Sequence, residues 1–484
     1  MPDTLRRNTI PVRNPRTGEI DYHITPPTAD ELSAKAQSLR AAQKDWAAAP
    51  IEHRCAVMLQ WAAAIDKNRK AIVAAESTDT GRFRIASESP DALIWGIRGW
   101  ADRAPEIVKK ALLEGTSSTM PHVRYRSQLK PYPLLGVISP WNFPMMLSAI
   151  DATPALIAGC AAMIKPSEVT PRFVEPLMET IQKVPELAKV LTYVVGDGET
   201  GQNLIANADI VCFTGSVPTG RKVAEACARR FIPVFLELGG KDPVIVTENA
   251  DLDRATDAVL RGSVYATGQI CYSIERVYVQ EKIHDAFVEK LVDKAKQVDL
   301  NYPDVHKGHI GPFIFAKQAA IVDEQLDDAT KRGAKLRTGG KSQNLGGGLY
   351  MRPTVLTDVT HDMKIMRDET FGPVIPVVKY KTKDEAIKLA NDTEFGLSGA
   401  VIAGSEDEAI ELGREIDAGG ISLQDTTLTT SILRDAEKTS FNLSGMGGSR
   451  MGPASILRFF RKKALMINTQ PPSDMRNIKE LPAA

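Results

Sequence analysis

The spacing of hydrophobic positions changes along the chain. Between residues 28 and 75, and again from 85 to 113, apolar residues recur every three or four positions, which predicts amphipathic helices. From residue 136 onward, short aliphatic runs alternate with helical stretches, a pattern typical of a parallel α/β sheet. The predicted strands of this first run cover residues 137–138, 161–165, 191–195, 210–213 and 235–238.

A second α/β run covers roughly residues 244–440, with strands expected at 275–279, 374–380 and 400–403. Two further β-like segments, 122–129 and 464–468, lie outside both runs. The first of them leads into Lys-Pro-Tyr-Pro, which favours a sheet edge because proline donates no ladder hydrogen bond. The consecutive βα units of the first run predict a doubly wound, nucleotide-binding sheet.

Composition excludes several classes of protein. The chain has 484 residues, with 60 Lys+Arg and 60 Asp+Glu, so its formal net charge is zero and gives no general attraction to nucleic acid or to anionic membranes. The N-terminus lacks the apolar core of a secretory signal, and prolines interrupt the most apolar stretch, 134–164. We therefore expect a cytoplasmic protein of two or three domains, with no nucleic-acid or membrane partner.

The cysteines and histidines form no metal-ligand motif. Five cysteines lie far apart without a CxxC, and the seven histidines include no HExxH or HxxxH. This argues against a disulfide framework and against a common zinc site. We expect no metal.

Cys271 is the first candidate for chemistry, in the segment Gly-Gln-Ile-Cys-Tyr-Ser. A thiol is the side chain best suited to attack a carbonyl carbon at neutral pH, so Cys271 is a candidate nucleophile. The alternative is a small buried hydrophobic residue, the commoner state of a cytosolic cysteine. A nucleophile would also need an oxyanion donor, a base and an electron acceptor.

Two other segments offer the donor and the base. Asn142 lies in Pro-Trp-Asn-Phe-Pro, a stiff loop that can present a fixed amide to a developing alkoxide. The alternative is an asparagine that only satisfies the backbone of its turn. Glu237 lies between two leucines in Leu-Glu-Leu-Gly-Gly-Lys. Its carboxyl group either serves as a base or forms an ion pair with Lys241.

Three segments are candidates for binding a nucleotide. Residues 213–216, Phe-Thr-Gly-Ser, lie where a strand leads into a helix, whose N-terminus can bind a pyrophosphate. The segment from Lys165 to Glu168 follows an earlier strand, and Glu168 is placed to accept hydrogen bonds from two ribose hydroxyls. The Glu-Thr-Phe-Gly-Pro segment from Glu369 is either a plain turn or a clamp on a sugar ring.

Taken in order, PWNFP, KPSE, FTGS, ELGGK, GQxC and ExFGP resemble the motifs of the aldehyde dehydrogenase superfamily. The resemblance covers about residues 14–469, and the 34 residues that separate Glu237 from Cys271 match the usual arrangement of that family. Because a non-catalytic relative would have lost Cys271 or Glu237, the alternative of a binding or structural protein is disfavoured. A plain cysteine hydrolase would need a histidine beside the thiol, and no histidine lies in such a motif.

The resemblance implies a role for each motif. Cys271 would be the nucleophile, Asn142 and the Cys271 N–H the oxyanion hole, and Glu237 the base that hydrolyses the thioester to a carboxylic acid. The cofactor would be NAD, with NADP possible. Its expected contacts are Lys165 and Glu168 on the adenosine ribose, Ser216 and Trp141 on the pyrophosphate, Glu369 and Phe371 at the nicotinamide ribose, and Ile138, Ser139, Pro140, Ser167, Gly198, Phe213, Gly215, Thr219, Leu238 and Gly239 along the cleft.

The resemblance also implies the architecture. We expect an α/β protein with a Rossmann-like cofactor domain (1–115 and 132–238), an α/β catalytic domain (239–445) and a small β oligomerisation arm (116–131 and 460–484). The exposed strand edges of such an arm require partners, which predicts a homodimer or homotetramer.

The chain departs from the family pattern at three places. Asp151 stands nine residues after Asn142, where the family usually has lysine, so an anion would lie near the catalytic centre and alter thiolate formation or the proton path. Ser-Arg-Met at 449–451 replaces the usual glutamate after the SGxG segment. Gln424 stands where asparagine is more typical.

The expected substrate passage is mainly apolar. By resemblance its walls are Met145, Met146, Ile150, Ile270 and Tyr272. Relatives that act on succinate semialdehyde often carry arginine at the position of Ile150, so we predict an uncharged, medium-sized aromatic or aliphatic aldehyde. The alternative is a semialdehyde, because Arg276 or the loop at 426–442 could still supply a cation.

Overall fold

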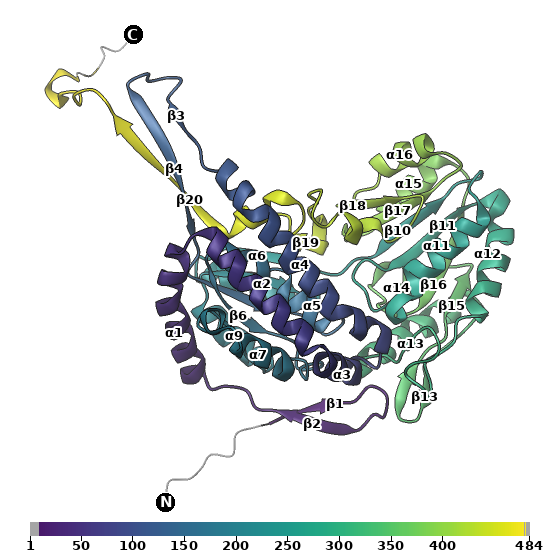
Figure 1. Cartoon of the computed structure of the whole chain (residues 1–484). Coiled ribbons are helices and arrows are strands. Elements are labelled where there is room, and N and C mark those ends of the chain that lie inside the picture. Colours follow the sequence, from purple (N-terminus) through teal and green to yellow (C-terminus); the bar gives the residue numbers. More distant parts are fainter. Residues whose placement is uncertain (1–8, 479, 481–484) are drawn as a thin grey trace, which may run out of the picture.

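The chain folds around two large sheets and a projecting three-stranded arm (Figure 1). The computed structural model describes residues 9–478 and 480, so the expected ends of the cofactor domain and the arm, at residues 1 and 484, lie outside the described residues. A hairpin of β1 (Ile10–Arg13) and β2 (Ile20–Ile24) precedes the first helix. Arg13 of this hairpin donates to the Gly347 carbonyl (3.0 Å), which joins the start of the chain to the second lobe.

Four helices form the first part of the first lobe: α1 (Ala29–Ala48), α2 (Ile51–Lys67), α3 (Arg69–Thr80) and α4 (Phe83–Lys110). The stretch 28–75, predicted as one helical region, is divided because Pro50 precedes α2 and Asn68 separates α2 from α3. Thr28 starts α1 with a capping box, in which its hydroxyl and the Glu31 carboxylate each accept a backbone N–H. A cap of this kind stabilises a helix by about 1 kcal/mol.

The first large sheet has the strand order β19-β9-β8-β5-β6-β7. All of its neighbouring pairs are parallel except β19 with β9. Its strands are β5 (Leu134–Ile138), β6 (Ala161–Lys165), β7 (Leu191–Tyr193), β8 (Ile210–Thr214), β9 (Val234–Glu237) and β19 (Gly445–Met446). The connecting segments carry α5 (Pro144–Ala149), α6 (Ala152–Ala158), α7 (Val174–Gln182), α8 (Pro185–Ala188), α9 (Gly198–Asn207) and α10 (Val217–Arg229).

The strand order of this sheet reverses at β5. From β5 the chain proceeds to β6 and β7 on one side, and then returns to β8 and β9 on the other. In doubly wound sheets, a crevice opens at this reversal, outside the carboxyl ends of the strands. The loops after β5 and β8 therefore face each other there.

The second large sheet has the strand order β12-β15-β16-β11-β10-β17-β18. Its strands are β10 (Asp242–Val246), β11 (Ile274–Gln280), β12 (Lys335–Thr338), β15 (Thr354–Thr357), β16 (Val374–Tyr380), β17 (Ser398–Ile402) and β18 (Gly420–Leu423). Its helices are α11 (Leu252–Val264), α12 (Glu281–Lys296), α13 (Ala316–Lys331), α14 (Lys364–Arg367), α15 (Lys383–Asn391) and α16 (Glu406–Arg414). Short elements complete the described chain: β13 (Gln343–Leu345), β14 (Gly348–Tyr350), η1 (Tyr265–Gly268), η2 (Leu428–Ile432), η3 (Asn442–Ser444), η4 (Pro453–Phe459) and η5 (Met475–Asn477).

Both faces of the second sheet are buried. Ile245 packs into one hydrophobic cluster, while its neighbours Val244 and Val246 pack into the cluster on the opposite face. Successive side chains of a strand point to opposite faces, so helices on both sides are needed to cover such a continuous apolar run.

The arm is a three-stranded antiparallel sheet with the order β20-β4-β3 (Figure 1). Its strands are β3 (Glu114–Thr116), β4 (Val123–Pro131) and β20 (Phe460–Asn468). The segments predicted at 122–129 and 464–468 thus form one ladder, in which Phe460 pairs with Pro131 and Asn468 with Val123. Apart from Phe460, every residue of β20 is exposed.

Candidate active site

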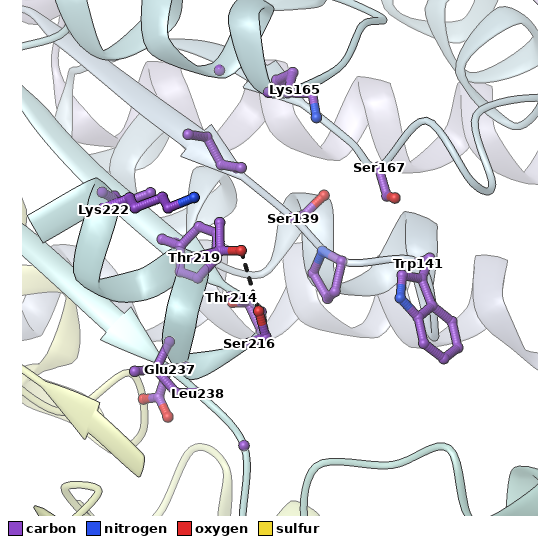
Figure 2. Close-up of a pocket in the computed structure, with 18 of the residues that line it drawn as sticks. Ser139, Trp141, Lys165, Ser167, Thr214, Ser216, Thr219, Lys222, Glu237 and Leu238 are labelled. Carbon is purple, nitrogen blue, oxygen red and sulfur yellow. Dashed lines mark hydrogen bonds between the residues drawn. The ribbon is translucent and has the colours of Figure 1, made fainter. Parts of the chain in front are cut away.

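A cavity of about 920 Å³ opens at the strand reversal of the first sheet and reaches Cys271 in the second lobe. Its walls come from the loops after β5, β6, β8 and β9 and from the second lobe (Figure 2). All sixteen of the predicted cofactor contacts line this cavity, together with Asn142, Glu237 and Cys271. The five predicted substrate contacts do not line it.

The N-terminus of α10 faces the cavity. Ser216 is the N-cap residue in extended conformation, and its side chain caps no backbone N–H but donates to Thr219 Oγ1 at 3.2 Å (Figure 2). The first N–H groups of this 13-residue helix therefore have no side-chain cap. An uncapped helix N-terminus of this kind attracts phosphate through its N–H groups and its dipole.

The loop after β6 carries a buried lysine beside a half-buried acid. Lys165 Nζ donates to Glu168 Oε2 at 3.2 Å, and both residues line the cavity. Ser139 stands on the neighbouring loop, and its buried hydroxyl has no hydrogen-bond partner within the described chain. Because buried polar groups are nearly always satisfied, this free hydroxyl and the acid indicate that the cleft fits a hydroxyl-rich ligand such as a dinucleotide.

Glu369 and Phe371 form the opposite wall of the cleft. Glu369 Oε1 accepts the Gly240 N–H at 3.2 Å, and a Cβ built on Gly239 would lie only 2.5 Å from the same carboxylate. Burial, followed by the charge of Glu275, raises the pKa of Glu369 to about 8. The Phe371 ring meets Trp141 edge to face, with 5.4 Å between centroids.

A buried ion pair that sequence reasoning missed anchors this wall. Lys241 Nζ lies 2.7 Å from Glu275 Oε2, and both side chains are almost fully buried. The Glu275 carboxylate also accepts the N–H groups of Thr370 and Phe371, each at 2.8 Å. The available signal was an acid within a wholly buried strand, since buried acids require partners.

Cys271 lies in the turn between η1 and β11 and is half-buried, whereas the other four cysteines are buried. Gly268 makes the turn possible: its φ is +67°, and a Cβ would overlap the Gly372 carbonyl. Burial raises the pKa of the Cys271 thiol to about 12, although the Lys438 ammonium opposes this rise. The resting thiol is therefore protonated at neutral pH.

Asn142 joins the loop after β5 to the segment before Cys271. Its Nδ2 donates to the Gln269 carbonyl at 3.0 Å, and its buried Oδ1 has no partner among the described residues. Arg82 donates to the main-chain carbonyl of Asn142. The amide thus does more than satisfy its own turn, because it contacts a chain segment 127 residues away.

Glu237 ends β9 and lines the cavity (Figure 2). Its Oε2 accepts a hydrogen bond from the Ser440 hydroxyl at 2.9 Å. The alternative ion pair with Lys241 is wrong, because Lys241 is bound to Glu275 and to the Thr370 hydroxyl.

Asp151 is not a free anion near the catalytic centre. Its side chain is 1% exposed and forms ion pairs with Arg450 (2.6 Å) and Arg458. Both guanidiniums lower the pKa of Asp151 against the opposing effect of burial. The anion at position 151 is therefore paired within the fold, and its effect on thiolate formation or on the proton path stays a prediction.

The predicted substrate residues divide into two groups. Met145 and Ile270 are buried, Met145 within the hydrophobic core of the first lobe, whereas Met146, Ile150 and Tyr272 are half-buried. The packing of Met145 thus makes it a core residue.

Arg276 supplies no cation to this region. It is fully buried, and its guanidinium donates to the carbonyls of Lys241, Leu389 and Ala390. The loop at 426–442 does bring a cation, Lys438, whose Nζ donates to the Leu397 carbonyl at 3.3 Å. A Cβ added at Gly240 would lie 2.7 Å from the Cys271 carbonyl oxygen and 3.2 Å from Leu397 Cβ, so Leu397 and the Cys271 backbone lie on the same side of Gly240.

The described residues contain neither a helix suited to cross a membrane nor a cluster of metal-ligating side chains. No helix in residues 9–478 has both the length and the hydropathy needed to cross a membrane. No group of three or more His, Cys, Asp or Glu side chains in that part of the chain is arranged to hold a metal ion.

Comparison with known proteins places these features in a family context. A sequence model described as "Aldehyde dehydrogenase family" matches residues 3–465. A Mycolicibacterium smegmatis protein whose name is "Putative succinate-semialdehyde dehydrogenase", with NADP(+) given in that name as the cofactor, is 33% identical to this chain. The match covers 97% of this chain and 92% of that protein.

Solved structures are similar over almost the whole chain. An Anabaena variabilis protein described as a "Putative Aldehyde Dehydrogenase" is 49% identical, with a TM-score of 0.94 over 98% of this chain and all of that one. A betaine aldehyde dehydrogenase of Staphylococcus aureus in complex with NAD+ is 27% identical, with a TM-score of 0.90 over 98% of this chain and 97% of that one.

Replacement of Glu275 by glutamine tests the buried anchor. The substitution leaves the Lys241 ammonium buried without a counter-ion, and breaking such a pair costs about 3–5 kcal/mol. We expect Glu275→Gln to unfold at a clearly lower urea concentration and to bind the dinucleotide more weakly, because glutamine keeps only one of the two oxygens that accept the Thr370 and Phe371 N–H groups. Urea unfolding and a cofactor titration measure the two effects.

The matched control is Glu248→Gln, which breaks the exposed ion pair with Lys282. Exposed pairs contribute about 0–1 kcal/mol, so this variant should behave like the parent protein. Equal stability of Glu275→Gln and Glu248→Gln would contradict the anchoring role.

Proposed function

Since this chain belongs to the aldehyde dehydrogenase family, which confirms the expected α/β fold and NAD(P)-dependent aldehyde oxidation, we propose that Cys271, Asn142 and Glu237 are its catalytic residues. One observation carries the assignment. The three residues come from separate segments, yet all line the inner part of the same cavity. The amide of Asn142 binds the Cys271 turn, and the charge of Glu237 acts on the Cys271 thiol.

The first step requires a thiolate. The thiol is protonated at rest, so the attacking thiolate forms when its proton passes to solvent, and Glu237 stays unprotonated for the later hydrolysis step. The sulfur then forms a bond to the aldehyde carbon, and the carbonyl oxygen becomes an oxyanion. Asn142 Nδ2 and the Cys271 N–H are the donors for this oxyanion, and a donor of this kind contributes about 10²–10³-fold to the rate.

The nicotinamide cofactor, when bound, accepts the hydride from the aldehyde carbon and so converts the adduct to a thioester. The α10 N-terminus, Lys165 and Glu168 would hold its pyrophosphate and adenosine ribose, and Glu369 with Phe371 its nicotinamide end. Glu237 then takes a proton from water, whose oxygen attacks the thioester carbon. The carbon–sulfur bond breaks, the acid leaves and the thiol is restored.

A non-catalytic role and a cysteine hydrolase remain weaker alternatives. The strongest electrostatic partners of Cys271 are Lys438, Asp242, Glu237 and Glu369, with no histidine among them. A cysteine hydrolase would use a histidine as its base.

Two substitutions test the mechanism. Cys271→Ala should abolish both aldehyde oxidation and ester hydrolysis while dinucleotide binding persists, whereas Cys227→Ala, at a buried cysteine, should retain both activities.

Glu237→Gln should keep a first-turnover burst of reduced cofactor but slow the steady state about 10²–10⁴-fold, because an amide cannot take a proton from water. Absorbance at 340 nm follows both phases, and substantial oxidation by Cys271→Ala would exclude the assignment.

We further propose a preference for NAD over NADP. The half-buried Glu168 carboxylate beside Lys165 would accept both hydroxyls of the adenosine ribose and repel a 2′-phosphate. The similar proteins include one whose name gives NADP+ as the cofactor and one whose structure was solved in complex with NAD+. We expect kcat/KM to favour NAD by at least about tenfold and Glu168→Gln to narrow that ratio. Equal efficiency of the two cofactors with the parent enzyme would refute the proposal.

The proposed substrate is an uncharged, medium-sized aromatic or aliphatic aldehyde. Ile150 and Met146 offer no cation to a second carboxylate, and Arg276 is committed to backbone carbonyls. Burying an unpaired carboxylate costs several kcal/mol. We therefore expect kcat/KM for benzaldehyde or hexanal to exceed that for succinate semialdehyde.

Lys438 favours the semialdehyde alternative, because it brings a positive charge toward Cys271. The variant Lys438→Met distinguishes an uncharged aldehyde from a semialdehyde as the substrate. If Lys438 binds a substrate carboxylate, this variant loses activity with succinate semialdehyde far more than with hexanal. A clear advantage of the semialdehyde with the parent enzyme would overturn our choice.

The arm supports a homodimer or homotetramer. Leu465, Met466 and Ile467 on β20 are exposed, and Met466 is 75% exposed. Apolar residues on an edge strand are stabilised when a second copy of the chain covers them and pairs with the open backbone groups. Light scattering at micromolar concentration should give at least twice the chain mass, and a monomer would disprove the assembly.

A further inference from the structure

A buried cluster of charges lies behind Glu237, outside the cavity wall described above. Asp151, next to α6, accepts from the Arg450 guanidinium at 2.6 Å and also from Arg458. The three side chains are 1%, 11% and 8% exposed. The cluster thus holds one carboxylate and two guanidiniums, which leaves one buried positive charge in excess.

A buried charge without a counter-charge is costly, so the excess requires an anion nearby. Glu237 is that anion. Burial lowers the pKa of Arg450, but Asp151, and after it Glu237, raise it to a net value above the ordinary one. Arg458 instead lies over the Phe235 and Phe459 rings, with 5.0 Å and 4.8 Å to their centroids.

Strand pairing explains why Arg450 reaches Glu237. Arg450 Nη2 donates to the Thr214 hydroxyl at 2.6 Å, and Thr214 is the residue paired with Glu237 across β8 and β9. The guanidinium is therefore tied to the strand position directly beside the carboxylate.

The same chain segment holds Glu237 from its other side. Gly445 of β19 pairs with Glu237, and the Ser444 carbonyl accepts the Leu238 N–H at 2.9 Å. The Ser440 hydroxyl donates to the carboxylate itself. Residues 440–450 thus surround Glu237 with a backbone ladder, a hydroxyl donor and a cation.

We propose that Arg450, held by Asp151 and Thr214, is a positioning residue that holds the Glu237 carboxylate in place for hydrolysis of the thioester. Both residues stand at departures noted in the sequence: an acid at 151 where lysine is usual, and Ser-Arg-Met at 449–451 in place of the usual glutamate.

This inference rests on the proposed role of Glu237 as the base. The test uses the full chain, hexanal and NAD, and separates the burst of reduced cofactor from the steady-state rate. Arg450→Met should keep the burst and slow the steady state at least tenfold, and Arg450→Lys should recover part of that loss. Arg458→Met is the matched control, because it removes the other guanidinium from Asp151 and leaves the cation at Glu237. Its steady-state rate should fall less than threefold.

A double variant provides a second readout that a folding defect does not imitate. Because Arg450 acts through Glu237, the steady-state rate of Glu237→Gln/Arg450→Met should be no lower than that of Glu237→Gln alone, and a further tenfold loss would contradict the proposal. Thermal unfolding and cofactor binding verify that each variant is folded.

Each outcome bears on one proposal. A burst and steady state that fall together, or equal losses in Arg450→Met and Arg458→Met, would overturn the positioning role of Arg450. A steady-state rate of Arg450→Met within twofold of the parent rate would also overturn this role. Should the parent show no aldehyde oxidation, or Glu237→Gln turn over normally, the proposed function fails instead.

Discussion

The buried ion pair of Lys241 and Glu275 holds together the parts of the molecule that make the site. Lys241 lies on the link from the first sheet to β10, and Glu275 lies in β11, four residues after the nucleophile candidate Cys271. The carboxylate also accepts the two N–H groups that follow Glu369. One buried acid therefore fixes the junction of the sheets, the strand after Cys271 and the cofactor-side loop. Such a pair tolerates burial because every oxygen has a donor.

Several charges near the cavity follow the same rule. Asp151 is neutralised by Arg450 and Arg458, and Arg276 binds only carbonyl groups and a tyrosine hydroxyl within the core. Each is fixed in one geometry by partners that fill its hydrogen-bonding capacity. Two of the buried polar atoms that have no partner in the described chain line the cavity: Ser139 Oγ and Asn142 Oδ1. These two atoms are free to meet a ligand.

The state of Cys271 illustrates how the site balances protection and reactivity. Burial keeps the thiol protonated at rest, and the surrounding acids reinforce this effect. A protonated thiol resists oxidation and unwanted alkylation, since the thiolate is the reactive form. The Lys438 ammonium lowers the pKa of the thiol, whereas the carboxylate of Glu237, the proposed base, raises it. Residues 438–450 therefore contact or act on both the proposed nucleophile and the proposed base.

By itself, the sequence determined the α/β class, the strand–turn–helix segments and the candidates Cys271, Asn142 and Glu237, because those signals lie in short stretches of neighbouring residues. It predicted one helical stretch at 28–75 where the chain forms three helices, and it left the partners of charged residues open. Only the tertiary structure decided that Lys241 binds Glu275 and that Asp151 binds an arginine 299 residues away. Charge pairing depends on which elements meet in space, and a local pattern of residues does not contain that information.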